Sequence, residues 1–215
     1  PYWIIGWSVG GMIAHNVAIH LEQQDQQVEL LAMMDAYPSD LWRRFAFETL
    51  NGEEEESLAL AALLFIAGIA LPFDQELPSL VVPKGEILQR AETIALLRKH
   101  GSALASLDDG TLDRLIDVVI NSRRLVGQSE HGHFYGNLLF FTAAAPRAED
   151  WVDLEAWRPY VHGRIQNIDI DCDHPAMARA EALRDIAGHL DAAFARFAQR
   201  TSVSKLNYTI EYITQ

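Results

Sequence analysis

The sequence has little of what a secreted, membrane-spanning or nucleic-acid-binding protein needs. Cys172 is the one cysteine, so no disulfide can form within the chain, and a reducing cytoplasm is the expected compartment. Lysine and arginine number 17 against 30 acidic residues, which gives a formal net charge of −13. Such a charge argues against binding to nucleic acid or to an anionic membrane surface. The apolar run Leu58–Leu71 ends at Pro72 and is too short to cross a bilayer.

The chain also has no recognisable leader. It opens on Pro1, without an initiator methionine or a signal peptide, which predicts that the beginning of a longer polypeptide is missing here. With 215 residues, 49% of them hydrophobic, the chain can bury a sizeable core. We therefore expect one globular domain, or one domain with a subdomain. We find no internal repeat and no low-complexity linker.

Strand and helix patterns alternate along the chain, with one long interruption. Apolar and β-branched runs predict four strands, at residues 2–5, 28–34, 138–143 and 164–170. Helical periodicity follows the first strand, where Ile13, Val17 and Leu21 recur every four residues with Ala14 and Ala18 beside them. It returns at about 178–199, with a four-spaced apolar stripe formed by Ala182, Ile186, Leu190 and Phe194. Residues from about 39 to 132 favour helices, including 84–99 and 112–125. This alternation predicts an α/β fold, with a mostly parallel sheet and helices on its faces.

The most informative segment is GWSVGG, residues 6–11, between the first strand and its helix. A strand, a sharp turn with Ser8 between glycines, and a helix form the pattern of a nucleophile elbow. The turn forces Ser8 into a strained backbone conformation, while Gly6 and Gly10 leave room for close packing of strand and helix. The N–H of Val9 is then free to bind an oxyanion at the positive end of the helix. The pattern also arises by chance, but its flanking strand and helix favour a nucleophilic Ser8.

A serine nucleophile needs a base to take its proton and a carboxylate to orient that base. In α/β hydrolases the chain order is serine, acid, histidine, each at the carboxyl end of a strand. His174 lies just past the last strand and is the predicted base. Asp35 ends the second strand before a tight turn and is the predicted acid. Asp150, or its neighbour Glu149, is the alternative acid, because many hydrolases place the acid after the next strand; Asp150 also fits a helix N-cap.

Other polar side chains offer weaker alternatives. His15 and His20 lie on the first helix, away from any strand end, and we interpret them as surface or packing residues. His131 and His133 have the spacing of a metal pair, but such clusters are common without metal, and we predict no metal site. Cys172 is interpreted as a small packing residue rather than a ligand or a thiol nucleophile.

These motifs resemble the thioesterase domains that end nonribosomal peptide synthetases, which have close relatives in polyketide synthases. The segment GWSVGG resembles the G-W-S-x-G-G elbow of that family, and residues 35–38, DAYP, resemble its acid followed by a small or polar residue, an aromatic and proline. In that family the acid follows this earlier strand, which supports Asp35. Residues 157–160 and 172–174 resemble its C-terminal segment, with the cysteine of siderophore-type synthetases. The resemblance covers about residues 1–200.

The resemblance implies an α/β-hydrolase fold with a helical lid at about 39–132, and a serine hydrolase that binds no cofactor of its own. A carrier domain of the same synthetase would deliver a peptidyl or acyl thioester on its phosphopantetheine arm. Ser8, Asp35 and His174 would form the catalytic triad. The reaction would pass through an acyl-Ser8 intermediate. Water, or an internal amine or hydroxyl that closes a macrocycle, would then release the product. The N–H of Val9 would meet the oxyanion.

The family also implies segments that this sequence does not contain. Its early strands and its second oxyanion donor precede the elbow, so an isolated 1–215 chain is expected to leave a sheet edge and an apolar face uncovered. The tail, residues 201–215, fits nothing in the family. The apolar lid is expected to exclude water and shape the cavity, although packing within the lid explains each aromatic singly. Those aromatics are Trp42, Phe45, Phe47, Phe65 and Phe73.

Two other functions stay open at this point. A different serine hydrolase, such as an esterase or a stand-alone editing thioesterase, would hydrolyse simple esters and need no carrier protein. A non-catalytic hydrolase-fold module would bind an acyl chain or a partner protein and leave Ser8 inert. The presence of Ser8, Asp35 and His174 together favours catalysis over that last alternative.

Overall fold

Four parallel strands form one sheet within the residues that the computed structural model describes, which are 1–45, 51–71, 82, 86–147 and 151–213. The strands lie in chain order, β1-β2-β3-β4, and every neighbouring pair is parallel. Their bounds are Tyr2–Trp7, Val28–Met34, Leu138–Ala143 and Ile165–Ile170. The four predicted strands are therefore confirmed. Because they are all parallel, their carboxyl ends lie at the same end of the sheet.

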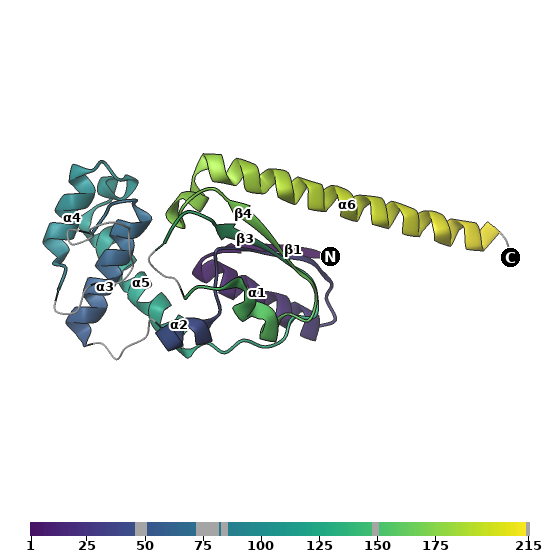
Figure 1. Ribbon diagram of the computed structural model, residues 1–215, viewed down its shortest axis with the longest axis horizontal. Helices are drawn as coiled ribbons and strands as arrows, with labels where there is room; N and C mark the ends of the chain where they lie inside the picture. Colours follow the sequence, from purple (N-terminus) through teal and green to yellow (C-terminus); the bar gives the residue numbers. More distant parts are fainter. Residues whose placement is uncertain (46–50, 72–81, 83–85, 148–150, 214–215) are drawn as a thin grey trace.

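Helices cover both faces of this sheet. α1 (Val9–Gln23) lies on one face and α6 (Ala180–Ile213) on the other, below and above the strands in Figure 1. Alternate side chains of β2 point to opposite faces, so Leu31 and Met33 pack in the α1-side core. Ala32 and Met34 pack in the α6-side core with Ala182 and Ile186. The predicted α/β architecture is confirmed.

The buried face of α1 differs from the predicted one. Met12, Ala14, His15 and Ala18 are buried, whereas Ile13 and Val17 are 59% and 43% exposed. Ala14 and Ala18 of the predicted face are thus confirmed as buried, whereas Ile13 and Val17 of that face point outward. Small alanines bring α1 close to the sheet directly after the tight turn at Ser8, and the larger side chains at four-residue spacing then point outward. The expected uncovered apolar face is present on this helix.

The expected uncovered sheet edge is also present. β1 pairs only with β2 among the described strands, and its other side is an edge of the sheet. Tyr2 and Ile5 on this strand are 47% and 48% exposed.

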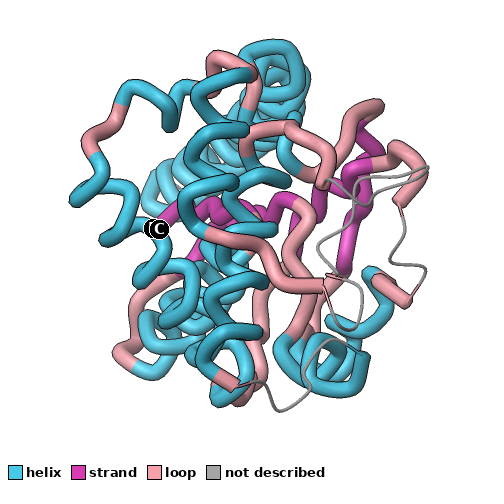
Figure 2. Tube along the Cα trace, turned by 90° about the vertical axis from the view of Figure 1, so that its left-hand side faces the viewer, coloured by secondary structure: helices cyan, strands magenta, loops and turns pink. Residues whose placement is uncertain are grey.

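Between β2 and β3 the described chain is helical, as predicted. α2 (Ser39–Phe45), α3 (Gly52–Ile66), α4 (Arg90–Lys99) and α5 (Asp109–Gln128) occupy this segment. The last three gather to one side of the sheet in Figure 1, and they stand in front of the strands in Figure 2, which views the molecule from that side. They have a separate core, in which Leu60, Leu64, Leu97 and Ile116 are almost fully buried.

The ends of these helices follow local chemistry. Asn51 and Glu54 form a reciprocal capping box at the start of α3, and the acids that follow suit the positive end of the helix. The apolar run Leu58–Leu71 is helical only as far as Ile66, because the chain turns at Gly68 with φ +71°. α4 begins at Arg90 rather than at residue 84.

The last helix is longer than predicted. α6 runs through residue 213 instead of ending near 199, so the described part of the predicted tail is helical, and Figure 1 shows it extending past the sheet. Its predicted apolar stripe is confirmed at the sheet, where Ala182 and Ile186 are buried. Phe194 stacks on Trp3 with ring centres 3.9 Å apart. None of the described helices is both long and apolar enough to cross a membrane.

Candidate active site

The turn between β1 and α1 has the strained geometry that the sequence predicts. Ser8 has φ +54° and ψ −128°, a conformation that a non-glycine residue seldom adopts. Two backbone hydrogen bonds hold it there: the Ser8 N–H donates to the Met34 carbonyl at 3.0 Å, and the Gly11 N–H donates to the Ser8 carbonyl at 2.9 Å. Val9 is the first residue of α1, so its N–H has no partner within the helix.

Room for this turn comes from Gly6 and Gly11 rather than from Gly6 and Gly10. A Cβ atom on Gly6 would lie under 3.0 Å from backbone atoms of Gly10 and Gly11. A Cβ atom on Gly11 would similarly collide with the side chain of Ala36, whereas a Cβ atom on Gly10 would meet nothing within 4 Å. The prediction for Gly10 is therefore wrong, because its Cβ position faces open space and only its backbone is approached.

Asp35 and His174 are in direct contact. The imidazole Nδ1 of His174 lies 2.7 Å from the Asp35 Oδ2 atom, across 139 positions of sequence. Asp35 directly follows β2 and is 3% exposed, and its N–H donates to the Phe141 carbonyl at 2.8 Å. His174 follows β4 and begins the short 3₁₀ helix Pro175–Ala178. The sheet thus brings the predicted acid and base together from two strand ends.

The second oxygen of Asp35 has three further partners. Its Oδ1 accepts hydrogen bonds from the Tyr37 hydroxyl at 2.9 Å, the Ala143 N–H at 3.2 Å and the Arg147 Nη2 at 3.0 Å. Burial alone would raise the pKa of the Asp35 carboxyl, but the bonds and charges of His174 and Arg147 together lower the pKa below its ordinary value. Asp35 is therefore held as a carboxylate in its buried position.

Ser8 lies next to this pair without bonding to it. Trp7, the preceding residue, stacks on the His174 ring at a centroid distance of 5.2 Å. Within the described residues, the Ser8 hydroxyl makes no hydrogen bond. Such bonds often form only when substrate is present, so this geometry is compatible with a resting serine nucleophile.

The imidazole of His174 is stacked against two aromatic rings. Trp7 covers it from the elbow, and Phe65 of α3 lies 6.1 Å from it with a 26° angle between the ring planes. Among the predicted lid aromatics, Phe65 thus reaches the site, while Trp42 packs against Trp151. The remaining three fall outside the described side chains, namely Phe45, Phe47 and Phe73.

The other predicted alternatives are placed as follows. Asp150 and Glu149 lie outside the described residues. His15 is fully buried and its Nε2 donates to the Tyr160 carbonyl at 3.2 Å, which fits the packing interpretation. Cys172 is partly buried, and burial, together with nearby aspartates, raises the pKa of its thiol, which disfavours a thiolate.

The pair His131 and His133 is not brought together as a metal site. The His131 Nε2 accepts a hydrogen bond from the Ser39 N–H at 3.0 Å, whereas the ring of His133 lies near that of His162. Burial, with a smaller effect from nearby His15, lowers the pKa of His131 to about 4. In the part of the chain that is described, no group of three or more His, Cys, Asp or Glu side chains is arranged to hold a metal ion.

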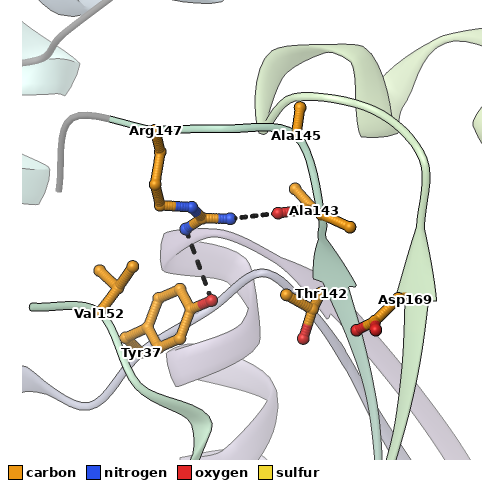
Figure 3. Close-up of a pocket in the computed structure, with 8 residues that line it drawn as sticks. Tyr37, Thr142, Ala143, Ala145, Arg147, Val152 and Asp169 are labelled. Carbon is orange, nitrogen blue, oxygen red and sulfur yellow. Dashed lines mark hydrogen bonds between the residues drawn. The ribbon is translucent and has the colours of Figure 1, made fainter. Parts of the chain in front are cut away.

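Sequence reasoning missed the role of Arg147. This residue lies four positions beyond the end of β3, and its guanidinium points back toward the Tyr37 hydroxyl and the Ala143 carbonyl (Figure 3). It forms one wall of an open pocket of about 400 Å³, which Thr142 and Asp169 also line. The only sequence signal for this contact is a basic residue shortly after β3, the strand that pairs with β2 and so lies next to Asp35.

Comparison with known proteins assigns this chain to a family. The thioesterase domain family matches residues 1–194. The chain is 35% identical over 187 residues to a dimodular nonribosomal peptide synthase of Bacillus subtilis (strain 168), which covers 86% of this chain and 7% of that protein. This chain thus spans only a small part of that relative, and the resemblance to thioesterase domains of nonribosomal peptide synthetases is confirmed.

Solved structures show the same fold. A four-domain nonribosomal peptide synthetase bound to AMP and glycine matches with a TM-score of 0.67 and 19% identity, over 89% of this chain and 14% of that one. The Vlm2 thioesterase domain matches with a TM-score of 0.56 and 21% identity, over 88% and 67% of the two chains. The predicted α/β-hydrolase fold is thereby confirmed. With its match across residues 1–194, this chain belongs to the thioesterase domain family of enzymes.

Proposed function

We propose that this domain releases a peptidyl or acyl chain from the thioester of a carrier protein, through an acyl-Ser8 intermediate. The observation that carries the proposal is the 2.7 Å contact between His174 Nδ1 and Asp35 Oδ2, beside a strained Ser8 at a helix N-terminus. A serine on a tight turn next to an oriented imidazole is the arrangement that activates a hydroxyl for attack on a carbonyl.

In the first half-reaction the Ser8 Oγ attacks the thioester carbonyl carbon, and His174 takes the hydroxyl proton at Nε2. Asp35, bonded to Nδ1, fixes the imidazole tautomer and stabilises the imidazolium. The oxyanion of the tetrahedral intermediate accepts a hydrogen bond from the N–H of Val9, favoured by the α1 dipole. The carbon–sulfur bond then breaks, and His174 gives its proton to the sulfur, which leaves as the phosphopantetheine thiol.

In the second half-reaction a nucleophile attacks the acyl-Ser8 ester. Water gives a free acid, whereas an amine or hydroxyl of the bound chain gives a macrocycle. His174 deprotonates that nucleophile and protonates Ser8 as it leaves. Phe65, which lies on the face of His174, acts as part of a lid over the ester that limits access of bulk water.

The delivering partner is a carrier domain with a phosphopantetheine arm, and the domain needs no cofactor of its own. The similarity to a dimodular nonribosomal peptide synthase supports this assignment over a stand-alone hydrolase. The substrate class that follows is a peptidyl or acyl thioester held on a carrier protein.

A serine-directed fluorophosphonate tests the proposal. Intact mass after exposure of the full-length protein should show one adduct that is absent in Ser8→Ala. Turnover of carrier-bound acyl thioester should then exceed turnover of a simple ester of the same acyl group. No adduct on folded protein would reject the catalytic function, and equal turnover of both substrates would favour the esterase alternative.

A further inference from the structure

We propose that Arg147 is a positioning residue of this active site, which holds Asp35 in the orientation that directs Oδ2 to His174. This inference rests on the proposed function of Ser8 and His174. Within the described residues, Arg147 bonds to Asp35, Tyr37 and Ala143 and not to Ser8 or His174, so its effect on the reaction passes through Asp35.

The two oxygens of Asp35 have separate environments. Among the described residues, Oδ2 bonds to the imidazole of His174 only, whereas Oδ1 bonds to neighbours on β3 and on the turn after β2. Arg147 is the charged member of that second group, and its Nη2 bridges from Oδ1 to the Ala143 carbonyl at the end of β3. A carboxylate fixed by a bridging cation cannot exchange its oxygens by rotation without breaking the bridge.

The buried charge of Asp35 needs a partner that stays positive. The Asp35 side chain is 2% exposed, so its negative charge needs a partner in both states of the catalytic cycle. In the proposed mechanism His174 receives its positive charge with the proton of Ser8 and loses it again when that proton is passed on. Burial alone would lower the pKa of the Arg147 guanidinium, but the bond to Asp35 raises it, so Arg147 is positive throughout. It is the permanent counter-ion of Asp35.

A purely structural role predicts different behaviour. Arg147 also lies over the Tyr37 ring, with its guanidinium carbon 5.8 Å from the ring centre, and bonds to the Ala143 carbonyl. If these contacts only stabilised the loop, substitution would lower the unfolding midpoint and would leave the pH profile of the serine unchanged. The two roles are therefore separable by kinetics.

The experiment uses the full-length protein and the rate of Ser8 modification by a fluorophosphonate. Arg147→Met should slow modification by about tenfold, the change expected for loss of one charged hydrogen bond to a buried carboxylate. Arg147→Lys should be intermediate, because an ammonium keeps the charge but not the bridging geometry. Arg158→Met is the matched control, since Arg158 pairs with Glu155 on the surface, where both side chains are at least half exposed.

Chemical rescue distinguishes positioning from folding. Arg147 lines the open pocket shown in Figure 3, so Arg147→Ala leaves a site that a small cation can reach. Guanidinium ion at millimolar, non-denaturing concentration should restore most of the lost rate in Arg147→Ala. It should leave Arg158→Met and the wild type unchanged, and methylammonium should restore less, because it lacks the planar fork of donors.

The pH profile gives an independent readout. Among the described residues, the titratable and charged groups that interact with Asp35 are His174, Arg147, Tyr37 and Cys172. Arg147 lowers the pKa of Asp35, so its removal raises that pKa and the acid limb of the Ser8 modification profile should move to higher pH. Arg158→Met should leave that limb in place.

Each outcome decides between the inferences. If the wild type is not modified, or is modified equally in Ser8→Ala, the proposed function fails. If the wild type is modified and Arg147→Met reacts at the same rate, the assignment of Arg147 is overturned while the function stands. Arg147→Met could also react more slowly while the acid limb of the pH profile stays in place and guanidinium fails to rescue Arg147→Ala. That combination overturns the positioning role of Arg147 in favour of a structural role. Rescue together with a moved limb supports it.

Discussion

The glycines of the elbow offer a prediction in which the structure disagrees with the sequence pattern. In G-x-S-x-G both flanking glycines look equally necessary, which would make Gly6→Ala and Gly10→Ala equally harmful. In the structure, a Cβ atom on Gly6 would lie under 3.0 Å from backbone atoms of Gly10 and Gly11, which cannot move aside as a flexible side chain can. A Cβ atom on Gly10 would meet nothing within 4 Å.

The magnitudes follow from these contacts. Overpacking against rigid atoms costs about 1–3 kcal/mol, and we place Gly6→Ala at about 3 because backbone must shift. For a domain of this size that lowers the melting temperature by about 6–12 °C. Gly10 lies in the first turn of α1, where alanine is the better helix former by up to about 1 kcal/mol. Gly10→Ala should therefore match or exceed the wild type in stability.

The assay pairs unfolding with Ser8 reactivity. Urea unfolding gives the free energy of each variant, and the rate of fluorophosphonate modification reports the geometry of Ser8. Gly6→Ala opens the turn and displaces the hydroxyl, so its modification rate should fall about 100-fold, as for an ångström-scale misplacement. Gly10→Ala should keep most of its rate. Loss of reactivity in Gly10→Ala together with a normal Gly6→Ala would refute the packing argument.

Three further predictions concern the site and its surroundings. Asp35→Asn should lower the rate of turnover about 10⁴-fold, because the imidazole loses its fixed tautomer, whereas Asp150→Asn should leave turnover near that of the wild type; steady-state kinetics of both variants compare them. Phe65→Leu should lower turnover by up to about tenfold, the equivalent of one aromatic contact on His174, with little change in the unfolding midpoint. Burial lowers the pKa of His131 to about 4 in the folded protein, whereas the unfolded chain takes up the same proton near pH 6.5. The stability that neutral His131 contributes is therefore lost as the pH falls from about 6.5 toward 4. Urea unfolding across that range should show a smaller pH dependence in His131→Gln, and an unchanged slope would contradict the assignment.

The strands were predictable because parallel strands are covered on both faces. Val28–Met34 is apolar almost throughout, and the structure buries alternate residues of β2 in two different cores. An apolar run of this kind can be recognised as a buried strand from its composition alone. Asp35 could be selected as the acid for the same reason, since a carboxylate at the end of a fully covered strand is necessarily buried and needs a partner.

The face of α1 could not be predicted in the same way. Ile13 and Val17 are larger and more apolar than Ala14 and Ala18, so hydrophobicity alone does not show that only the alanines of the predicted face are buried. The deciding factor is the distance between helix and sheet, which the turn at Ser8 makes short. Only small side chains fit that gap, and this distance is a property of the packed structure rather than of the helix.

Arg147 was beyond sequence reasoning because its partner lies 112 positions away and no local pattern links the two. Helical and strand periodicities report which face of an element is buried. These periodicities do not show which loop after one strand folds back over the end of a neighbouring strand. Polar contacts between loops at the same edge of a sheet therefore need the structure, although the edge itself can be predicted.

The placement of the three predicted catalytic residues has one common cause in the sheet. The Ser8 N–H donates to the Met34 carbonyl, and the Asp35 N–H donates to the Phe141 carbonyl, so each residue that follows a strand extends the parallel ladder by one bond. Both residues have positive φ, +54° and +45°, and the ladder bond fixes each strained turn against its neighbouring strand. The side chains consequently leave the sheet at the same edge at fixed positions. His174 follows β4, and its bond to Asp35 then places the imidazole beside the other two predicted catalytic residues.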